Sequence, residues 1–168
     1  GEIRELDSDD AVDILSDLSN EKQEKVISFI KDENITENIR ELLNYEEDTA
    51  GGLMAKELIS VSENWSVLKC LREIRRQAKD ITRVHSIYVL NRKKVLIGRL
   101  SLKDLITSPS KSKIQEIYIP KVDYVHVNDS ADEVAKLMSK YDLEAIPVVN
   151  YNIELLGRIT IDDIVDYI

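Results

Sequence analysis

Cysteine and histidine are scarce in this chain: its 168 residues include one cysteine and two histidines. The single cysteine, Cys70, cannot form a disulfide within the chain and fits a reducing compartment. Apolar residues recur around Cys70 at helical spacing, so we expect a small buried side chain rather than a reactive thiol. His85 and His126 stand alone in the sequence, so no zinc site is predicted.

Long apolar runs and the short motifs of common enzymes are also missing. No run of about eighteen apolar residues occurs, so no membrane-spanning helix is predicted, and the acidic N-terminus is unlike a signal peptide. The chain has no G-x-S-x-G elbow, P-loop, G-x-G-x-x-G run or D-x-D-x-D-G calcium loop. Its carboxylates have no neighbouring nucleophile, so we expect a protein that is not an enzyme.

Basic residues are outnumbered, and the imbalance is local. The net charge of −9 argues against nucleic acid and anionic lipid as partners. Residues 1–48 hold 16 of the 32 acidic and 5 of the 23 basic residues, a net charge of −11, whereas residues 49–168 carry +2. Within that second part, residues 123–168 contain ten acids against three bases. Two acidic regions are thus separated by a basic one, and cations are needed if their surfaces approach each other.

Residues 1–48 have the pattern of three short helices. Ser8, Asn20 and Thr36 are the expected N-caps, each followed by apolar residues at helical spacing. Three such helices bury little area, so we expect them to pack on the rest of the chain or to end a larger helical domain. The pair Gly51-Gly52 then permits the left-handed backbone of a helix stop, which places a domain boundary at about residues 48–53.

The remainder is an internal repeat. Each copy is expected to contain a strand, a helix, a second strand, a strand pair turning at a glycine, and a closing helix. Gly98 and Gly157 are the two glycines, and the copies superimpose there with an offset of 59 residues. Each copy is too small to close a core alone, so we expect the two to pack sheet to sheet with pseudo-twofold symmetry. The predicted segments are 58–61, 66–77, 86–90, 95–100 and 101–106, then 124–127, 130–140, 145–149, 153–159 and a helix opening at 160.

The closing motif of each copy carries a family resemblance. Gly98-Arg-Leu-Ser101-Leu-Lys-Asp104 and Gly157-Arg-Ile-Thr160-Ile-Asp-Asp163 share the pattern G-h-x-[ST]-x-x-D. The β-α-β-β-α unit that ends in this pattern resembles the CBS domain, and the pair resembles a tandem CBS (Bateman) module. The expected fold is therefore α+β, with a helical N-terminal segment at 1–48, a first CBS domain at 49–112 and a second at 113–168.

A closer resemblance covers the whole chain. The stretch Tyr45-Glu-Glu-Asp-Thr-Ala-Gly-Gly-Leu-Met54, followed by a CBS pair and Thr160-Ile-Asp-Asp-Ile-Val-Asp166, resembles the cytosolic region of MgtE-type magnesium transporters. The resemblance implies a soluble piece from the cytoplasmic side of an integral membrane transporter. It also implies a homodimer formed through the CBS domains. Most of the helical N domain, a connecting helix and the transporter's own transmembrane domain would lie outside this chain.

Several carboxylates are spaced as cation ligands. Asp9 and Asp13 lie four residues apart and Asp163 and Asp166 three apart, so each pair shares a helix face. Mg²⁺ prefers oxygen ligands and uses one or two carboxylates with several waters, which suits such sparse pairs. Ordinary helix capping by solvated acids explains the same residues equally simply.

The family resemblance assigns roles to these positions. It implies that Asp9 and Asp13 on the N-terminal helices face Asp163 and Asp166 across an interface, with the Gly52 carbonyl as a further ligand. It also implies a second set of ligands facing the connecting helix: Asp132, the Ser139 carbonyl and Asp142. Ser130 stands where the family has a carboxylate, so this second set is incomplete. The implied function is Mg²⁺ sensing, in which bridging ions favour a compact state that closes the pore.

Adenine-nucleotide sensing is the alternative function. CBS pairs in other proteins bind adenine nucleotides such as ATP between the copies. The pairs Ser101/Asp104 and Thr160/Asp163 are then expected to hold ribose hydroxyls. The sequence leaves both ligands, Mg²⁺ and ATP, open.

Overall fold

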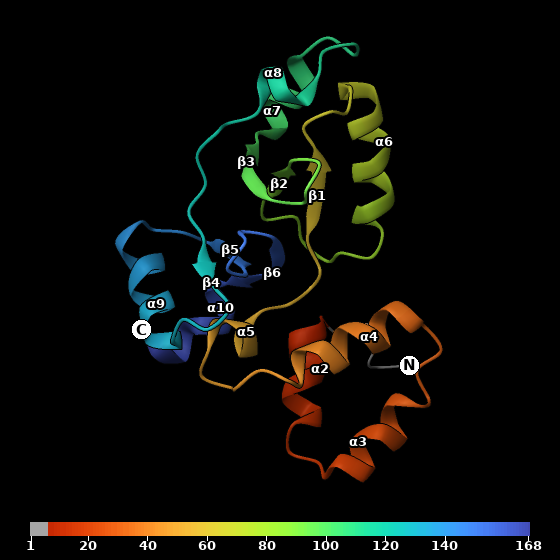
Figure 1. Cartoon of the computed structure of the whole chain (residues 1–168), viewed down its shortest axis with the longest axis vertical. Helices are drawn as coiled ribbons and strands as arrows, with labels where there is room; N and C mark the ends of the chain where they lie inside the picture. The colour runs from red at the N-terminus through yellow and green to blue at the C-terminus, as the bar shows by residue number, and fades with distance from the viewer. Residues whose placement is uncertain (1–6) are drawn as a thin grey trace.

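The computed structural model describes residues 7–168, which form an N-terminal helical segment and two repeats (Figure 1). The first six residues lie outside the described part. The helical segment consists of α2 (Ser8–Leu15), α3 (Asn20–Ile27) and α4 (Glu33–Leu42), and α2 packs on α4. All three predicted helices are therefore present.

The predicted N-caps of these helices were wrong, each by one to four positions. Asp7 precedes α2, because the Ser8 hydroxyl is used elsewhere, as described below. The Ser19 hydroxyl caps α3, and the Asp32 carboxylate caps α4 by accepting from two backbone N–H groups. Thr36 lies inside α4, where its hydroxyl donates to the carbonyl of Asp32.

The two repeats have the same topology, which confirms the β-α-β-β-α prediction and the α+β class. In each three-stranded sheet the first two strands are parallel and the last two antiparallel. The first repeat contains β1 (Ile59–Ser62), α6 (Val67–Ala78), β2 (Ile87–Leu90), β3 (Leu96–Leu100) and α7 (Leu102–Thr107). The second contains β4 (Val125–His126), α9 (Ala131–Lys140), β5 (Ala145–Val149), β6 (Leu155–Thr160), α10 (Ile161–Ile164) and the 3₁₀ helix η1 (Val165–Tyr167).

Gly98 and Gly157 lie inside single strands, so the predicted turn at each glycine was wrong. The chain turns before them, at residues 91–95 and 150–154. A Cβ atom on Gly98 would lie 2.2 Å from the Ile119 carbonyl oxygen, and one on Gly157 would lie 2.6 Å from the Ala55 carbonyl oxygen. The glycines are therefore needed for close approach of another backbone segment.

Those approaching segments are exchanged between the repeats. The short helix α5 (Ala50–Leu53) precedes the first repeat but packs on α9, β4 and β6 of the second. The short helix α8 (Ile114–Ile117) precedes the second repeat, and its flanking residues pair with the first through Ser66↔Lys113 and Arg99↔Ile119. Matching bridges, Ser130↔Thr49 and Arg158↔Ala55, hold α5. These equivalent pairs support the predicted pseudo-twofold symmetry.

The paired glycines before the first repeat also differ from the prediction. No glycine within residues 7–168 has a positive φ, so Gly51-Gly52 does not form a left-handed helix stop. Both residues belong to α5. A Cβ on Gly52 would lie 1.9 Å from the Glu46 carbonyl oxygen, and one on Gly51 would overlap the Tyr45 ring. Small size, rather than backbone freedom, explains this pair.

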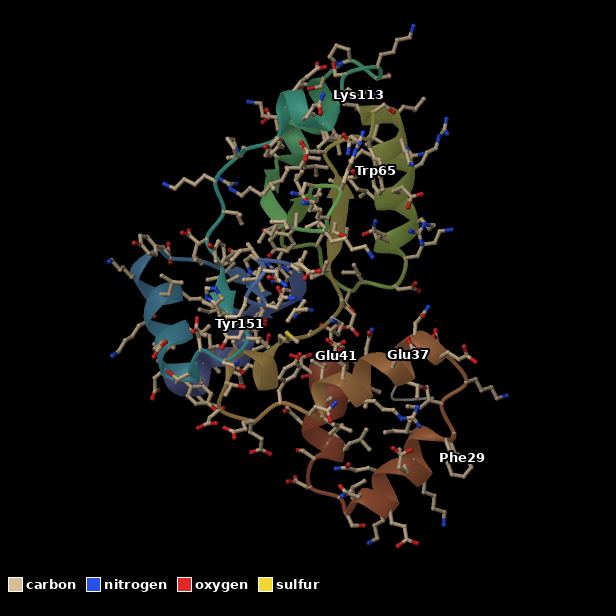
Figure 2. All side chains as sticks on the ribbon, in the orientation of Figure 1. Phe29, Glu37, Glu41, Trp65, Lys113 and Tyr151 are labelled. Atoms are coloured by element: carbon tan, nitrogen blue, oxygen red, sulfur yellow. The ribbon has the colours of Figure 1, made fainter. Side chains whose placement is uncertain are left out.

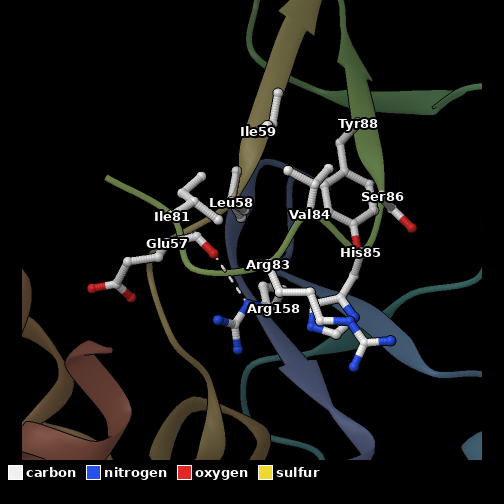
Figure 3. Close-up of a pocket in the computed structure, with 10 residues that line it drawn as sticks. All are labelled: Glu57, Leu58, Ile59, Ile81, Arg83, Val84, His85, Ser86, Tyr88 and Arg158. Atoms are coloured by element: carbon white, nitrogen blue, oxygen red, sulfur yellow. Dashed lines mark hydrogen bonds between the residues drawn. The ribbon is translucent and has the colours of Figure 1, made fainter. Parts of the chain in front are cut away.

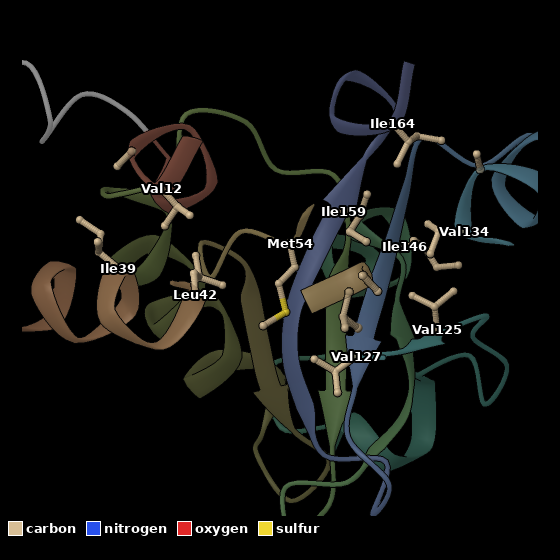
Figure 4. Close-up of a cluster of buried hydrophobic side chains, with 14 of the residues drawn as sticks. Val12, Ile39, Leu42, Met54, Val125, Val127, Val134, Ile146, Ile159 and Ile164 are labelled. Atoms are coloured by element: carbon tan, nitrogen blue, oxygen red, sulfur yellow. The ribbon is translucent and has the colours of Figure 1, made fainter. Parts of the chain in front are cut away.

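One apolar core joins the N-terminal helices to the second repeat. Figure 4 shows Met54 between Val12 and Leu42 on the helical side and Ile159 on β6. Each fully buried aliphatic side chain contributes about 1.5–3 kcal/mol. The first repeat has a separate core, and the two sheets meet through Tyr88, Leu96 and Val149. Within the described residues, no helix is both long and apolar enough to cross a bilayer.

Candidate functional site

The start of α2 is fixed against the segment that leads into the first repeat. The Ser8 backbone N–H donates to Glu57 Oε1 at 2.9 Å, and the Ser8 hydroxyl donates to Glu57 Oε2 at 2.7 Å. The Lys56 backbone N–H in turn donates to the Ser8 hydroxyl at 2.9 Å. A second contact joins Lys56 Nζ to Glu41 Oε2 at 3.0 Å, and Figure 2 shows Glu41 on α4 near the repeats. The first turn of α2 thereby faces the second repeat.

The start of α10 is fixed by a capping box. The Thr160 backbone N–H and hydroxyl both donate to Asp163 Oδ2, at 2.8 and 3.0 Å. The capping box holds the Asp163 carboxylate in the first turn of a short helix, on the side that faces α2. The sequence predicted the helix start at Thr160, and the structure confirms it.

Asp9 is buried against Asp163. Its side chain lies at the α2–α10 interface, the residue is 6 % exposed, and among residues 7–168 its Oδ1 atom has no hydrogen-bond partner. Burial, together with hydrogen bonding to the Asp163 carboxyl and repulsion from it, raises the pKa of Asp9 to about 9. The predicted meeting of these two residues is therefore present in the fold.

Two more carboxylates extend this acidic face. Burial and the charge of Asp163 raise the pKa of Asp10. Burial, Asp10 and Asp163 raise the pKa of Asp13. When α2 and α10 are together, the carboxylates of Asp163 and of the three α2 residues Asp9, Asp10 and Asp13 repel one another. Protons or another cation must therefore offset this repulsion.

The residues at this face fit a hydrated divalent cation. A buried carboxylate oxygen with no donor among the described residues, beside a second carboxylate, offers the hard oxygen ligands that Mg²⁺ prefers. Within residues 7–168, no three His, Cys, Asp or Glu side chains form a complete metal cage. An ion bound here would therefore keep several waters, as Mg²⁺ usually does.

The remaining predicted metal ligands lie on elements other than α2 and α10. Gly52 is half-buried in α5, and Asp166 is exposed on η1. Asp132 and Asp142 are exposed near opposite ends of α9, about 15 Å apart at 1.5 Å per residue, so they cannot ligate one ion. The Ser139 carbonyl already accepts from backbone N–H groups at the end of α9.

The clefts between the repeats are unequal. One cleft, of about 470 Å³, is lined by residues of both repeats that include Tyr88, Arg99, Lys121 and Tyr141. Its pseudo-symmetric counterpart holds about 10 Å³ and is filled by the Arg158 side chain, which lies among Glu57, Arg83 and His85 (Figure 3).

The two residue pairs predicted to bind nucleotide also differ in how accessible they are. Ser101 and Asp104 are half-exposed at the start of α7, whereas Thr160 is buried and bonded to Asp163. The second pair is therefore engaged within its own capping box.

Four residues of the interface were missed by the sequence analysis: Asp7, Asp10, Glu57 and Arg158. Arg158 is 6 % exposed, and its Nη2 donates to Asp7 Oδ2 at 2.6 Å. One sequence signal was available, because Arg158 is one of only three bases among ten acids in residues 123–168. Asp10 adjoins Asp9 in the first turn of α2.

Comparison with known proteins agrees with this architecture. Residues 2–48 match the MgtE intracellular N domain, and residues 50–111 and 114–168 each match the CBS domain. The magnesium transporter MgtE of Thermus thermophilus is 43% identical over 128 residues, which are 76% of this chain and 28% of that protein. The Bacillus subtilis magnesium transporter MgtE is 30% identical over 166 residues, 99% of this chain and 37% of that protein. Both relatives are named magnesium transporters, which agrees with the expectation that this chain is not an enzyme.

A solved structure is also similar over the whole chain. The crystal structure of the cytosolic domain of the Mg²⁺ channel MgtE in complex with ATP is 37% identical, with a TM-score of 0.88. The match covers 99% of this chain and 68% of that one. The chain spans about a third of the length of the curated relatives above. It belongs to the MgtE family of magnesium transporters, in which it comprises N-domain sequence followed by the tandem CBS domains.

Proposed function

We propose that this chain is the Mg²⁺-sensing regulatory region on the cytosolic side of a magnesium transporter. Mg²⁺ bridges the carboxylates of α2 and α10 and favours the compact state that closes the pore. The buried contact between Asp9 and Asp163 is the observation that carries the proposal. Both are acidic, both lie in the interface, and one Asp9 oxygen has no donor in the described part of the chain.

The mechanism follows from where the ligands lie. Asp9 and Asp163 come from different parts of the chain and meet only when α2 is docked on the second repeat. A bridging ion therefore binds the docked state more tightly than the undocked one, and this difference shifts the equilibrium. Asp13, Gly52 and Asp166 are proposed to support this site. Asp132 at the start of α9, and separately Ser139 and Asp142 at its end, are proposed to bind further ions toward the family's connecting helix.

Calorimetric titration with Mg²⁺ tests the sensor. Asp163→Asn keeps an oxygen that can cap α10 but removes the charge, so the Mg²⁺ affinity should fall about tenfold or more. Asp104→Asn changes the equivalent residue of the first repeat and is the matched control, because Asp104 lies in the first turn of α7, away from α2. Equal isotherms for the two variants would count against the site.

ATP binding is a second candidate function, favoured by the open cleft. Arg99 and Lys121 offer positive charge to phosphates, and Tyr88 and Tyr141 offer aromatic rings. We propose that ATP occupies this cleft, with Ser101 and Asp104 as the available ribose-binding pair. Arg99→Ala should weaken ATP binding several-fold, whereas Arg75→Ala, on the exposed side of α6, should not.

We further propose that the chain dimerises through its CBS domains and acts on the transporter's own transmembrane domain. Both repeats expose apolar side chains at equivalent places. Leu102 and Ile106 are exposed on α7, and Ile161 and Val165, offset by 59 residues, are exposed at α10 and η1. A second copy of the chain would cover such a repeated surface.

A further inference from the structure

Arg158 is a buried cation that touches three segments of the chain. It projects from β6, and its Nη2 donates to Asp7 Oδ2 at 2.6 Å. Its Nε donates to the Glu57 carbonyl at 3.1 Å, as Figure 3 shows, and its Nη1 lies 3.7 Å from Asp163 Oδ2. One guanidinium thus connects the N-terminal segment, the segment before β1, and α10.

The equivalent arginine of the first repeat has no such role. Arg99 follows Gly98 as Arg158 follows Gly157, and both backbones pair with an exchanged segment. The Arg99 side chain is exposed and lines the open cleft. The position alone therefore does not bury an arginine, and Arg158 differs in its contacts with Asp7 of the N-terminal segment and with the Glu57 carbonyl.

Arg158 places a positive charge among the carboxylates of the α2–α10 interface. Asp7, Asp9 and Asp163 all lie near its guanidinium, so acids outnumber this cation. Among the described residues, one other ion pair joins the N-terminal helices to the rest of the chain, Lys56 with Glu41, and that pair is more open to water. A buried charge loses much when its partner is removed, whereas a solvated pair loses little.

We propose that Arg158 is a built-in counter-cation that holds the N-terminal helices on the second repeat and sets how much Mg²⁺ the docked state requires. The inference rests on the proposed Mg²⁺-sensing function. Its contact with Asp7 exists only in the docked state, so it favours docking before any ion binds. A fixed cation beside the acidic face also reduces the charge that Mg²⁺ must offset.

The test is a Mg²⁺ titration of the whole chain, started in chelator and followed by small-angle scattering. Arg158→Gln should shift the compaction midpoint to about tenfold higher Mg²⁺ or more, the range expected for one charge-assisted hydrogen bond. Arg75→Gln, on the exposed side of α6, is the control and should leave the midpoint unchanged. Lys56→Gln should shift it less than Arg158→Gln.

Asp7→Asn gives the sharpest comparison, because two explanations predict opposite signs. If Asp7 is only one more repelling carboxylate, its neutralisation lowers the Mg²⁺ requirement. If it anchors Arg158, the requirement rises several-fold. Asparagine remains a good N-cap, so α2 should persist, and this variant decides the matter if Arg158→Gln fails to fold.

The outcomes separate the two proposals. A midpoint for Arg158→Gln equal to wild type, or a lowered one for Asp7→Asn, overturns the role of Arg158. If the dimensions of the wild-type chain do not change with Mg²⁺, the proposed Mg²⁺-sensing function is overturned instead. The comparison in chelator still tests Arg158 in that case, because Arg158→Gln must be less compact than wild type.

Discussion

At the scale of single residues, Asp9 is where burial and charge conflict most strongly. Its pKa rises from 3.8 to about 9 in the docked structure, so docking takes up a proton at neutral pH. The proton on Asp9 stabilises the docked state. This stabilisation is fully present below pH 3.8 and is lost as the pH rises through about 9. Without Mg²⁺, docking should therefore strengthen on acidification, by at most about 1.4 kcal/mol per pH unit. Scattering in chelator between pH 5 and 9 measures this, and a pH-independent radius of gyration would contradict it.

Neutralising Asp9 should imitate acidification. Asp9→Asn keeps the shape of the side chain but removes the buried charge, so the chain should be compact at neutral pH in chelator. Added Mg²⁺ should then change it little, because a ligand is gone. Asp17→Asn is the control, since Asp17 is exposed beyond the end of α2. Limited proteolysis with and without Mg²⁺ distinguishes the two, and equal protection patterns would refute the role of Asp9.

At the scale of elements, glycines decide how the exchanged segments attach. Gly157→Ala places a Cβ 2.6 Å from the Ala55 carbonyl oxygen, which forces β6 and that segment apart. Alanine normally suits a strand better than glycine, but overlap with backbone outweighs that gain. We expect Gly157→Ala and Gly98→Ala each to lower the free energy of unfolding, measured with urea, by about 1–3 kcal/mol. Arg99→Ala, an exposed neighbour, should stay within about 0.5 kcal/mol, and similar losses in all three would argue against the steric explanation.

Helix starts could be predicted where the signal lies in the local sequence, and less well where a residue far away in the sequence determines the local structure. The apolar spacing of α6 and α9 and their serine caps gave the correct starts. Ser8 carries the same capping signal, yet its hydroxyl bonds to Glu57, 49 positions away, so the helix begins one residue early. The glycines were interpreted as turns because the sequence does not reveal which backbone passes beside them.

At the scale of the whole molecule, family resemblance and charge distribution predicted that two acidic regions meet. The meeting of α2 with α10 through Asp9 and Asp163 agrees with that expectation. The cation already present between them was not predicted, because Arg158 and Asp7 are 151 positions apart and Arg99 has the same local sequence. Burial distinguishes the two arginines, and burial here depends on how the exchanged segments and the N-terminal helices assemble.

The repeated apolar surface leads to a prediction about assembly. Ile106 is 67% exposed on α7. A stable dimer must bury about 1,200–2,000 Å² in total. The interface would therefore cover Ile106 together with Leu102 on the same helix and Val165, the residue equivalent to Ile106 in the second repeat. Ile106→Glu would place a charge in that contact and should raise the dimer dissociation constant about tenfold or more. Ile14→Glu is the matched control, because Ile14 is 58% exposed but lies on α2. Sedimentation equilibrium measures both, and loss of dimer in both variants, or a monomeric wild type, would show that these helices do not form the interface.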